Sequence, residues 1–580
     1  AVFACFFALN LITPLTADAK DEQISNTQKE QIPIISQEHS KNLSRLVVQG
    51  FDGRSQPFDT ISRDILHKIS GLNSYEKDGA KLAPAAVIMS MMIEPKAWAN
   101  EPIIKIKDDE IKQILGLEKS AKFAKFNDFF TLDDKNESFY KISRAVEESN
   151  RKPSGNRGTF DKELLKLDER VNVMQMVFEG IYFKFIPKEN AKNNEWLSPA
   201  SLFSLDPHSE ETAAISALIS GYIGALSDGV KSGDFSRANE WLKVIKRYQE
   251  KLGSAVMISD AKIEMEIFFN KIRIFARLSA LYAISGISLL ILVFIRIQNP
   301  KFNANFAFKF VYFLNIFAFF THTFGLALRW YIANHAPWSN AYESLIYIAW
   351  SLSLSGIIFS RKSLLSLALT SILAGCTLMV ANLTDIDPQI TNIMPVLHSY
   401  WLTIHVSVIT ASYGFLGLCA LLGVFTLVLF CFINDKNSQI LTTNITEAVR
   451  INEAAMILGL ALLTIGNFLG GVWANESWGR YWGWDSKETW ALITILIYAA
   501  VLHVRLVKSL NSQFWFSIFA MWAYLSVIMT YFGVNFYLTG MHTYAAGEKI
   551  PVPSWLYAVL GVMCALSIGA FLRRKFSKKL

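Results

Sequence analysis

The chain has 580 residues, of which 52% are hydrophobic and 13% aromatic, and its mean hydropathy is +0.28. Soluble globular proteins usually contain about 45–50% apolar residues, so this excess excludes an ordinary soluble protein over the whole length. The formal net charge of +7 is modest, and much of it lies in short loops and in the basic tail at 573–575. Such a charge pattern is typical of membrane topology rather than of nucleic-acid binding.

Residues 1–17 are apolar, but they are too few for a complete membrane span of about 20 residues. The small residues around Ala17 and Ala19 resemble a cleavage site, so this stretch predicts a truncated transmembrane or signal-like segment. Either interpretation places the following residues outside the cytoplasm. Residues 18–275 are rich in Lys, Glu, Asp and Asn and predict an extracytoplasmic soluble module.

The pattern within this module is mainly helical. Residues 20–45 are polar and predict a loose linker, and Asp52-Gly53 predicts a turn. Apolar residues then follow with the spacing of one helix face, at Ile61, Ile65, Leu66 and Ile69. Further helices are expected over 111–130, 160–178, 210–226 and 236–252, and a break is expected to start at Ser227-Asp228-Gly229.

Residues 276–580 contain long apolar runs, each long enough to cross a membrane as a helix. The expected spans are 278–297, 306–330, 341–360, 363–383, 401–433, 452–475, 488–507, 514–540 and 554–572. The predicted fold class is therefore mainly α. We expect a polytopic α-helical membrane protein with about nine C-terminal spans and an N-terminal extracytoplasmic, mainly helical soluble module.

Basic residues indicate the orientation of these spans. They lie in alternate connections, at Arg296 with Lys301, Arg361 with Lys362, Lys436 with Arg450, and Arg505 with Lys508. Connections rich in Lys and Arg stay in the cytoplasm. The other connections, 331–340, 384–400, 473–487 and 541–553, are therefore expected to face outward.

One outer loop, 473–490, has the sequence WANESWGRYWGWDSKETW and is dense in tryptophan. Anchoring at the membrane interface explains one or two Trp residues, but not a cluster interleaved with Gly479 and Gly483. A flat aromatic shelf of indole rings would suit a large planar apolar ligand, and glycine allows close approach of the backbone. The candidate ligand-binding residues are Trp473, Trp478, Arg480, Trp482, Trp484, Asp485 and Trp490.

Two histidines are expected at the same depth as this loop. His405 lies about one turn inside the outer end of its span, and His542 lies just past the outer end of another. Two imidazoles on separate helices could ligate a haem iron from both sides. The alternative for each is a packed or hydrogen-bonded histidine with no ligand.

His503 lies about 24 Å along its helix from Lys487, toward the cytoplasmic half, and so is not expected to share a ligand with the outer pair. A ligand entering from the inner side could use it first, whereas the alternative is an ordinary interfacial histidine. Structural or hydrogen-bonding roles are favoured for His322, His335 and His398, which lies seven residues before His405.

At this point the sequence resembles a known family. The Trp-rich segment is similar to the signature of the WWD haem-handling family. The segments WLTIHVSVITASYGFL, YAAVLHVRL, YFGVNFYLTGMHTY and HAPWSNAYESLIYIAW resemble the cytochrome c synthase subunit CcsA, also called ResC. The resemblance covers residues 310–545 in ordered segments, and the chain looks like the C-terminal portion of a fused bacterial CcsBA protein.

The resemblance implies roles for individual residues. The Trp residues and Asp485 would belong to an outward haem-binding domain, His405 and His542 would be axial ligands of the outer haem iron, and His503 would bind the iron of an inner haem. A second transmembrane histidine would come from a CcsB or ResB-like half, fused or separate.

The implied activity is that of a holocytochrome c synthase, or haem lyase. It would join haem b, as substrate and bound ligand, to the CxxCH motif of apocytochrome c by positioning haem rather than with a nucleophile of its own. Haem transport across the membrane to that site is also implied. Arg480 is the best electrostatic match for a haem carboxylate.

The implied partners are apocytochrome c, the CcsB/ResB-like half, an extracytoplasmic thiol reductant and membrane lipid, and no nucleic acid is expected. The implied location is the bacterial inner (cytoplasmic) membrane, with the soluble module and the Trp-rich loop on the periplasmic side. Two alternatives stay open. One is a CcmC-like haem exporter or chaperone without ligation activity, and the other is a solute transporter without a cofactor.

Overall fold

The computed structural model describes residues 32–574 except for 78, 133–137, 154–155, 190, 192, 300–301, 384–387, 394–397, 435–436, 539, 541–551 and 553. The predicted segment 1–17 and His542 lie outside the described residues. The chain divides into two compact units, residues 1–270 and 271–580.

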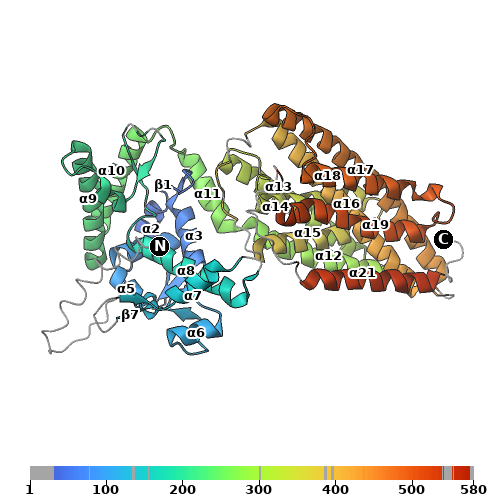
Figure 1. The fold of residues 1–580 in the computed structure, drawn as a ribbon, viewed down its shortest axis with the longest axis horizontal. Coiled ribbons are helices and arrows are strands. Elements are labelled where there is room, and N and C mark those ends of the chain that lie inside the picture. Colours follow the sequence, from blue (N-terminus) through green and yellow to red (C-terminus); the bar gives the residue numbers. More distant parts are fainter. Residues whose placement is uncertain are drawn as a thin grey trace. The chain divides into compact units, whose positions relative to one another are not determined.

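The first unit is mainly helical (Figure 1). Its helices are α2 (Gln37–Leu43), α3 (Phe58–Ser70), α4 (Pro84–Ile93), α5 (Pro95–Ala99), α6 (Asp109–Leu115), α7 (Ser143–Arg151), α8 (Thr159–Phe178), α9 (Glu210–Ser232), α10 (Ser236–Leu252) and α11 (Asp260–Ile272). Five antiparallel pairs of short strands complete it: β1 (Val47–Gln49) with β2 (Ser55–Pro57), β3 (Tyr75–Lys77) with β4 (Ala80–Leu82), β5 (Ile104–Lys105) with β6 (Phe123–Ala124), β7 (Phe130–Leu132) with β8 (Ser138–Tyr140), and β9 (Ile186–Pro187) with β10 (Trp196–Leu197).

Several sequence predictions for this unit are confirmed. The four apolar residues of α3 are buried on one face, α8 and α10 lie where helices were expected, and Gly53 forms a turn with a φ of +80°. That turn joins β1 to β2.

Three predictions for this unit are wrong. The helix expected over 111–130 ends at Leu115, because Gly116 adopts a φ of +75° and caps it. The break expected at 227–229 is absent from α9, which continues to Ser232 before Gly233. Residues 36–45 are not a loose linker, because Ser36 caps α2 and Leu43 is fully buried.

His39 on α2 is buried between α9 and α10. Its Nδ1 donates to Oδ1 of Asn239 at 2.7 Å, its Nε2 lies 3.2 Å from the hydroxyl of Tyr222, and its ring stacks on Phe235. Burial lowers the pKa of His39, and the hydrogen bond to Asn239 opposes only part of that shift.

This lowered pKa predicts a pH dependence of stability. Below a pH of about 6.5, the unfolded chain binds a proton at His39 more readily than the folded chain does. The contribution of neutral His39 to the free energy of unfolding is therefore fully present above that pH and is lost as the pH falls. The temperature at which the first unit becomes protease-sensitive should therefore drop on acidification, and His39→Gln should weaken that drop. His208→Gln, at an exposed histidine of the same unit, should keep the wild-type dependence; equal behaviour of both variants would refute the assignment.

The second unit is a bundle of long helices that run alongside one another (Figure 1). They are α12 (Ile274–Gln298), α13 (Asn305–Ala333), α14 (Ala341–Ser360), α15 (Leu364–Leu383), α16 (Tyr400–Phe432), α17 (Ser438–Trp478), α18 (Ser486–His503), α19 (Gln513–Ile528) and α21 (Ser554–Arg573). A π-helical turn, Met529–Gly533, continues α19 into α20 (Val534–Tyr537).

Each of the nine predicted spans corresponds to a long helix, although the helices of 488–507 and 514–540 end earlier than predicted, at His503 and Tyr537. Among the described residues, ten helices are long and apolar enough to cross a membrane, and the tenth is α9, whose apolar face is buried in the first unit. The protein is thus a polytopic α-helical membrane protein. Helix α17 begins at Ser438, well before the predicted start at 452.

Helix α16 occupies the centre of this bundle because glycines let its neighbours approach closely. A Cβ at Gly414 would lie 2.8 Å from the backbone nitrogen of Leu352 on α14, and one at Gly423 would lie 2.8 Å from the carbonyl of Ser517 on α19. On α17, a Cβ at Gly466 would lie 3.0 Å from the backbone nitrogen of Ile409. Helix α16 is therefore held at short distance by α14, α17 and α19. We call the end of the bundle with residues 334–340, 388–393, 479–485 and 540 the outer end, after the predicted orientation.

Candidate functional site

His405 lies in the second turn of α16, at the outer end, and is 8% exposed. Its Nδ1 lies 3.0 Å from the carbonyl oxygen of Trp401, one turn earlier on the same helix. A carbonyl can only accept, so Nδ1 carries the proton and the lone pair belongs to Nε2. The structure thus orients His405 as a metal-ligating imidazole is usually oriented.

Helix α17 forms one wall beside His405. A Cβ at Gly470 would lie 3.3 Å from Cδ2 of His405, so the imidazole packs close to the helix backbone. The ring of Trp473, 3% exposed, stacks on the imidazole with a centroid distance of 5.5 Å and an interplanar angle of 26°. The hydroxyl of Ser399 also donates to Glu476, which joins the start of α16 to the end of α17. Sequence reasoning did not single out Gly470, although the Gly470-Gly471 pair just before the Trp cluster is a visible signal.

The sequence predicted a single loop over residues 473–490, but the structure divides this segment between two helices and a short connection. Trp473 and Trp478 lie on the last turns of α17, Trp490 lies on α18, and only residues 479–485 form a connection. Gly479 ends α17 with a φ of +71°, and Asp485 with Glu488 forms a capping box that starts α18. The helix caps therefore limit the loop to seven residues.

The indole rings also do not form the predicted flat shelf. Trp473 meets Trp478 at 65°, and Trp482 meets Trp484 at 86°, so both pairs are edge-to-face. Trp484 is 72% exposed and has a φ of +55°, a left-handed conformation that is rare for a bulky residue. The side chain of Glu488 accepts hydrogen bonds from the backbone N–H groups of Gly483 and Asp485, at 2.8 and 3.3 Å. The loop is thus held in a conformation that presents one indole outward.

The loop folds back toward His405, and the first turn of α18 contacts α20. A Cβ at Gly471 would lie 2.9 Å from the carbonyl of Tyr481, so the loop backbone covers α17 one residue beyond Gly470. The ammonium of Lys487 donates to Asn535 at 3.1 Å. A Cβ at Gly540 would overlap Oδ1 of Asp485, so the chain passes directly against the loop there.

The predicted binding residues therefore meet only in part within the described chain. His405, Trp473 and Trp478 adjoin one another, and Tyr481 brings the loop with Arg480, Trp482, Trp484 and Asp485 over the end of α17. His542, two residues beyond Gly540, lies outside the described residues.

His503 lies at the opposite end of the bundle, at the last residue of α18, where it is exposed. Its Nδ1 lies 2.7 Å from the carbonyl oxygen of Ala499, so its ring has the same donor arrangement as His405. Arg505 pairs with Glu453 of α17 nearby, at 3.0 Å. The structure thus separates His503 from the outer group, as the sequence predicts.

The three remaining histidines of the bundle have other surroundings. His322 is fully buried on α13 beside the rings of Phe275 and Tyr282. His335 bridges carbonyl oxygens in two outer connections. His398 is exposed and precedes α16, which begins at Tyr400, so it does not lie on the helix that carries His405.

Comparisons with known proteins agree with this arrangement. Residues 338–542 match the family model described as Cytochrome C assembly protein. The chain is 40% identical over 540 residues to protein NrfI of Wolinella succinogenes, a match that covers 93% of this chain and 58% of NrfI. It therefore spans less than two thirds of that relative.

Shorter relatives are covered more completely. The chain is 36% identical over 252 residues to the cytochrome c biogenesis protein CcsA of Guillardia theta, and this match covers 40% of this chain and 83% of that protein. It is 35% identical over 248 residues to CcsA of Prochlorococcus marinus strain MIT 9312, and this match covers 38% of this chain and 80% of that protein. These matches, which include the Trp-rich outer end of the second unit, show that this chain is a member of the CcsA family of cytochrome c biogenesis proteins.

Proposed function

We propose that this chain is a cytochrome c haem lyase. It would bind haem b at the outer end of the bundle, with His405 and His542 as axial ligands, and promote its covalent attachment to apocytochrome c. Family membership supports the biogenesis role. The site supports the chemistry.

One observation carries this proposal. The Trp-rich segment makes three contacts: Tyr481 of the loop lies over α17 next to the position that faces His405, Lys487 of α18 binds Asn535 of α20, and Asp485 contacts Gly540. Because Gly540 is two residues from His542, these contacts support a pair of imidazoles on either side of one aromatic loop.

The hydrogen bond of His405 favours ligation. A hydrogen-bond acceptor on one imidazole nitrogen orients the ring and raises the basicity of the other nitrogen. The carbonyl of Trp401 does this for Nδ1 of His405, and the stacked ring of Trp473 restricts rotation of the imidazole. Arg480 would contact a haem propionate, because a guanidinium matches a carboxylate with two parallel hydrogen bonds.

The reaction would need no nucleophile from this chain. Each thiol of the CxxCH motif adds across a haem vinyl group, so that a C–S bond forms and the thiol hydrogen ends on the neighbouring vinyl carbon. This addition consumes neither oxidant nor reductant, but it requires reduced thiols, which explains an extracytoplasmic thiol reductant as partner. The chain would contribute orientation and exclusion of water.

His503 would hold haem at the inner end before transfer to the outer site. Its second ligand would come from a CcsB/ResB-like half, fused or separate. The soluble module and the Trp-rich loop would lie on the periplasmic side of a bacterial inner membrane, as the basic connections indicate.

The test is to purify the full chain, produced together with a ResB-like half, and to record its absorption spectrum oxidised and reduced. A CxxCH reporter produced in the same cells is then examined for covalent haem on a denaturing gel. We expect a Soret band in the purified protein and covalent haem in the reporter. Bound haem without covalent product would favour a CcmC-like exporter or chaperone, and the lack of any Soret band would favour a transporter without cofactor.

A further inference from the structure

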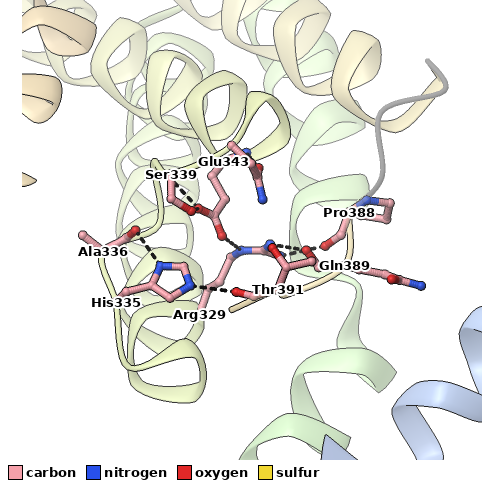
Figure 2. Close-up of polar contacts among 9 residues, drawn as sticks. Arg329, His335, Ala336, Ser339, Glu343, Pro388, Gln389 and Thr391 are labelled. Atoms are coloured by element: carbon pink, nitrogen blue, oxygen red, sulfur yellow. Dashed lines mark hydrogen bonds and ion pairs between the residues drawn. The ribbon is translucent and has the colours of Figure 1, made fainter. Parts of the chain in front are cut away.

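A buried polar network lies beside the site, at the outer ends of α13 and α14. Arg329 and Glu343 are 1% and 0% exposed, and Nε of Arg329 donates to Oε1 of Glu343 at 2.9 Å (Figure 2). A buried ion pair repays its desolvation only when its remaining donors and acceptors are also satisfied. Here Oε2 of Glu343 accepts from the backbone and the hydroxyl of Ser339, at 2.9 and 2.7 Å.

The other donors of Arg329 hold a different segment of the chain. Its two Nη atoms donate to the carbonyl oxygens of Pro388 and Gln389, at 2.9 and 3.0 Å (Figure 2). Nε2 of His335 lies 3.1 Å from the carbonyl of Thr391 in the same segment. Residues 388–391 belong to the connection between α15 and α16, so this network ties that connection to the α13–α14 connection, which carries Trp338.

Trp338 reaches α16 itself from the same α13–α14 connection. Its Nε1 donates to the carbonyl of Thr403 at 3.0 Å, two residues before His405. The indole is held by the rings of Trp330 and Tyr347, with centroids at 5.3 and 4.8 Å. In the first turns of α16, the carbonyl of Trp401 thus accepts a hydrogen bond from His405, and the carbonyl of Thr403 accepts one from Trp338.

We propose that Arg329, Glu343 and Trp338 form a brace that fixes the outer end of α16 and so positions His405 as a haem ligand. This inference rests on the proposed function. The three are positioning residues, because none of them is in the proposed contact set of the haem. Glycine packing already holds the rest of α16 against its neighbours, so the brace acts on the first turns, where the ligand lies.

The sharpest variant is Trp338→Phe, which keeps an aromatic ring and removes the N–H donor to Thr403. Its matched control is Trp350→Phe on α14. Trp350 also donates one hydrogen bond, from Nε1 to the hydroxyl of Thr323 at 2.9 Å, and also packs on Tyr347, but its bond joins α14 to α13 and not to α16.

Two measurements on the full chain decide the proposal. Hydrogen exchange of residues 400–409 reports the order of the first turns of α16 without haem. The haem dissociation constant, with the low-spin spectrum and its rescue by free imidazole, reports ligation by His405. We expect Trp338→Phe to raise hydrogen exchange in these residues and to weaken haem binding about 10-fold, the lower end of the loss seen when groups that orient a metal ligand are removed. Trp350→Phe should change neither.

The double variant Arg329→Met with Glu343→Leu tests the other half of the brace. It removes both charges together, which spares the fold an unpaired buried ion, yet it frees the carbonyls of Pro388 and Gln389. We expect the same two changes as for Trp338→Phe. Wild-type exchange and wild-type haem affinity in both sets of variants would overturn the brace, and so would raised exchange with unchanged haem ligation. A wild-type chain that binds no haem would overturn the proposed function, and the exchange data alone would then show whether the three residues hold α16.

Discussion

Replacing His405 by alanine is expected to abolish the low-spin spectrum of haem at the outer site and to reduce covalent haem on a CxxCH reporter to background. The reason is that His405 would provide an axial ligand whose orientation is set by Trp401 and Trp473. Free imidazole should restore part of the spectrum, because it can occupy the space of the missing side chain. Absorption of the purified chain, oxidised and reduced, measures the effect, and alanine at His542 should give the same result.

The matched control is His398→Ala. His398 lies in the connection between α15 and α16, where it is exposed and precedes the helix that carries His405. This variant should keep wild-type haem content and wild-type synthesis. An unaltered spectrum with undiminished synthesis in His405→Ala would remove this residue from the ligand set.

Trp473 and Trp484 are expected to respond differently to alanine. Trp473 is 3% exposed and packs on both His405 and Trp478, so its truncation should cost about 3–5 kcal/mol of stability and also loosen the imidazole. Trp484 is 72% exposed, so its truncation should change stability by only about 0.5 kcal/mol while it lowers haem loading. Thermal unfolding and haem per protein, measured on the same detergent-solubilised samples, separate the two effects.

Trp473→Phe serves as the control for packing, because it restores a ring against the imidazole. It should recover most of the stability and most of the haem content. Full haem loading in Trp484→Ala would mean that the exposed indole has no part in binding, and unchanged thermal unfolding in Trp473→Ala would contradict its structural role.

The structure also shows what determines the shape of the Trp-rich segment. Composition alone suggested a flat shelf of indoles, but the rings form two edge-to-face pairs. Edge-to-face contacts are favoured between aromatic rings because the positive edge of one ring meets the negative face of the other. Only Trp484 of these four is highly exposed, so any planar ligand would meet one outward indole rather than a sheet of them.

The sequence by itself determined the membrane class, the nine spans and the family. Apolar runs of sufficient length have few alternatives to a helix in a bilayer, because each backbone group must find its partner within the segment. For the same reason the depth of His405 and of His503 could be predicted from their position along a run. The Trp signature was readable because its density exceeds what interfacial anchoring requires.

The tertiary structure alone decided which of these residues meet. Helix ends set by Gly479, Gly116 and Gly233 depend on single residues whose effect competes with the surrounding helical pattern. The stacking of Trp473 on His405, the hydrogen bond from Trp338 to Thr403, and the hydrogen bond from Arg329 to Pro388 join residues that are far apart in the chain. Hydropathy predicts the depth of a residue in the membrane, but it does not predict which residues of other helices that residue contacts. Those contacts arise from the shape of both helix surfaces and from glycines that let the helices approach.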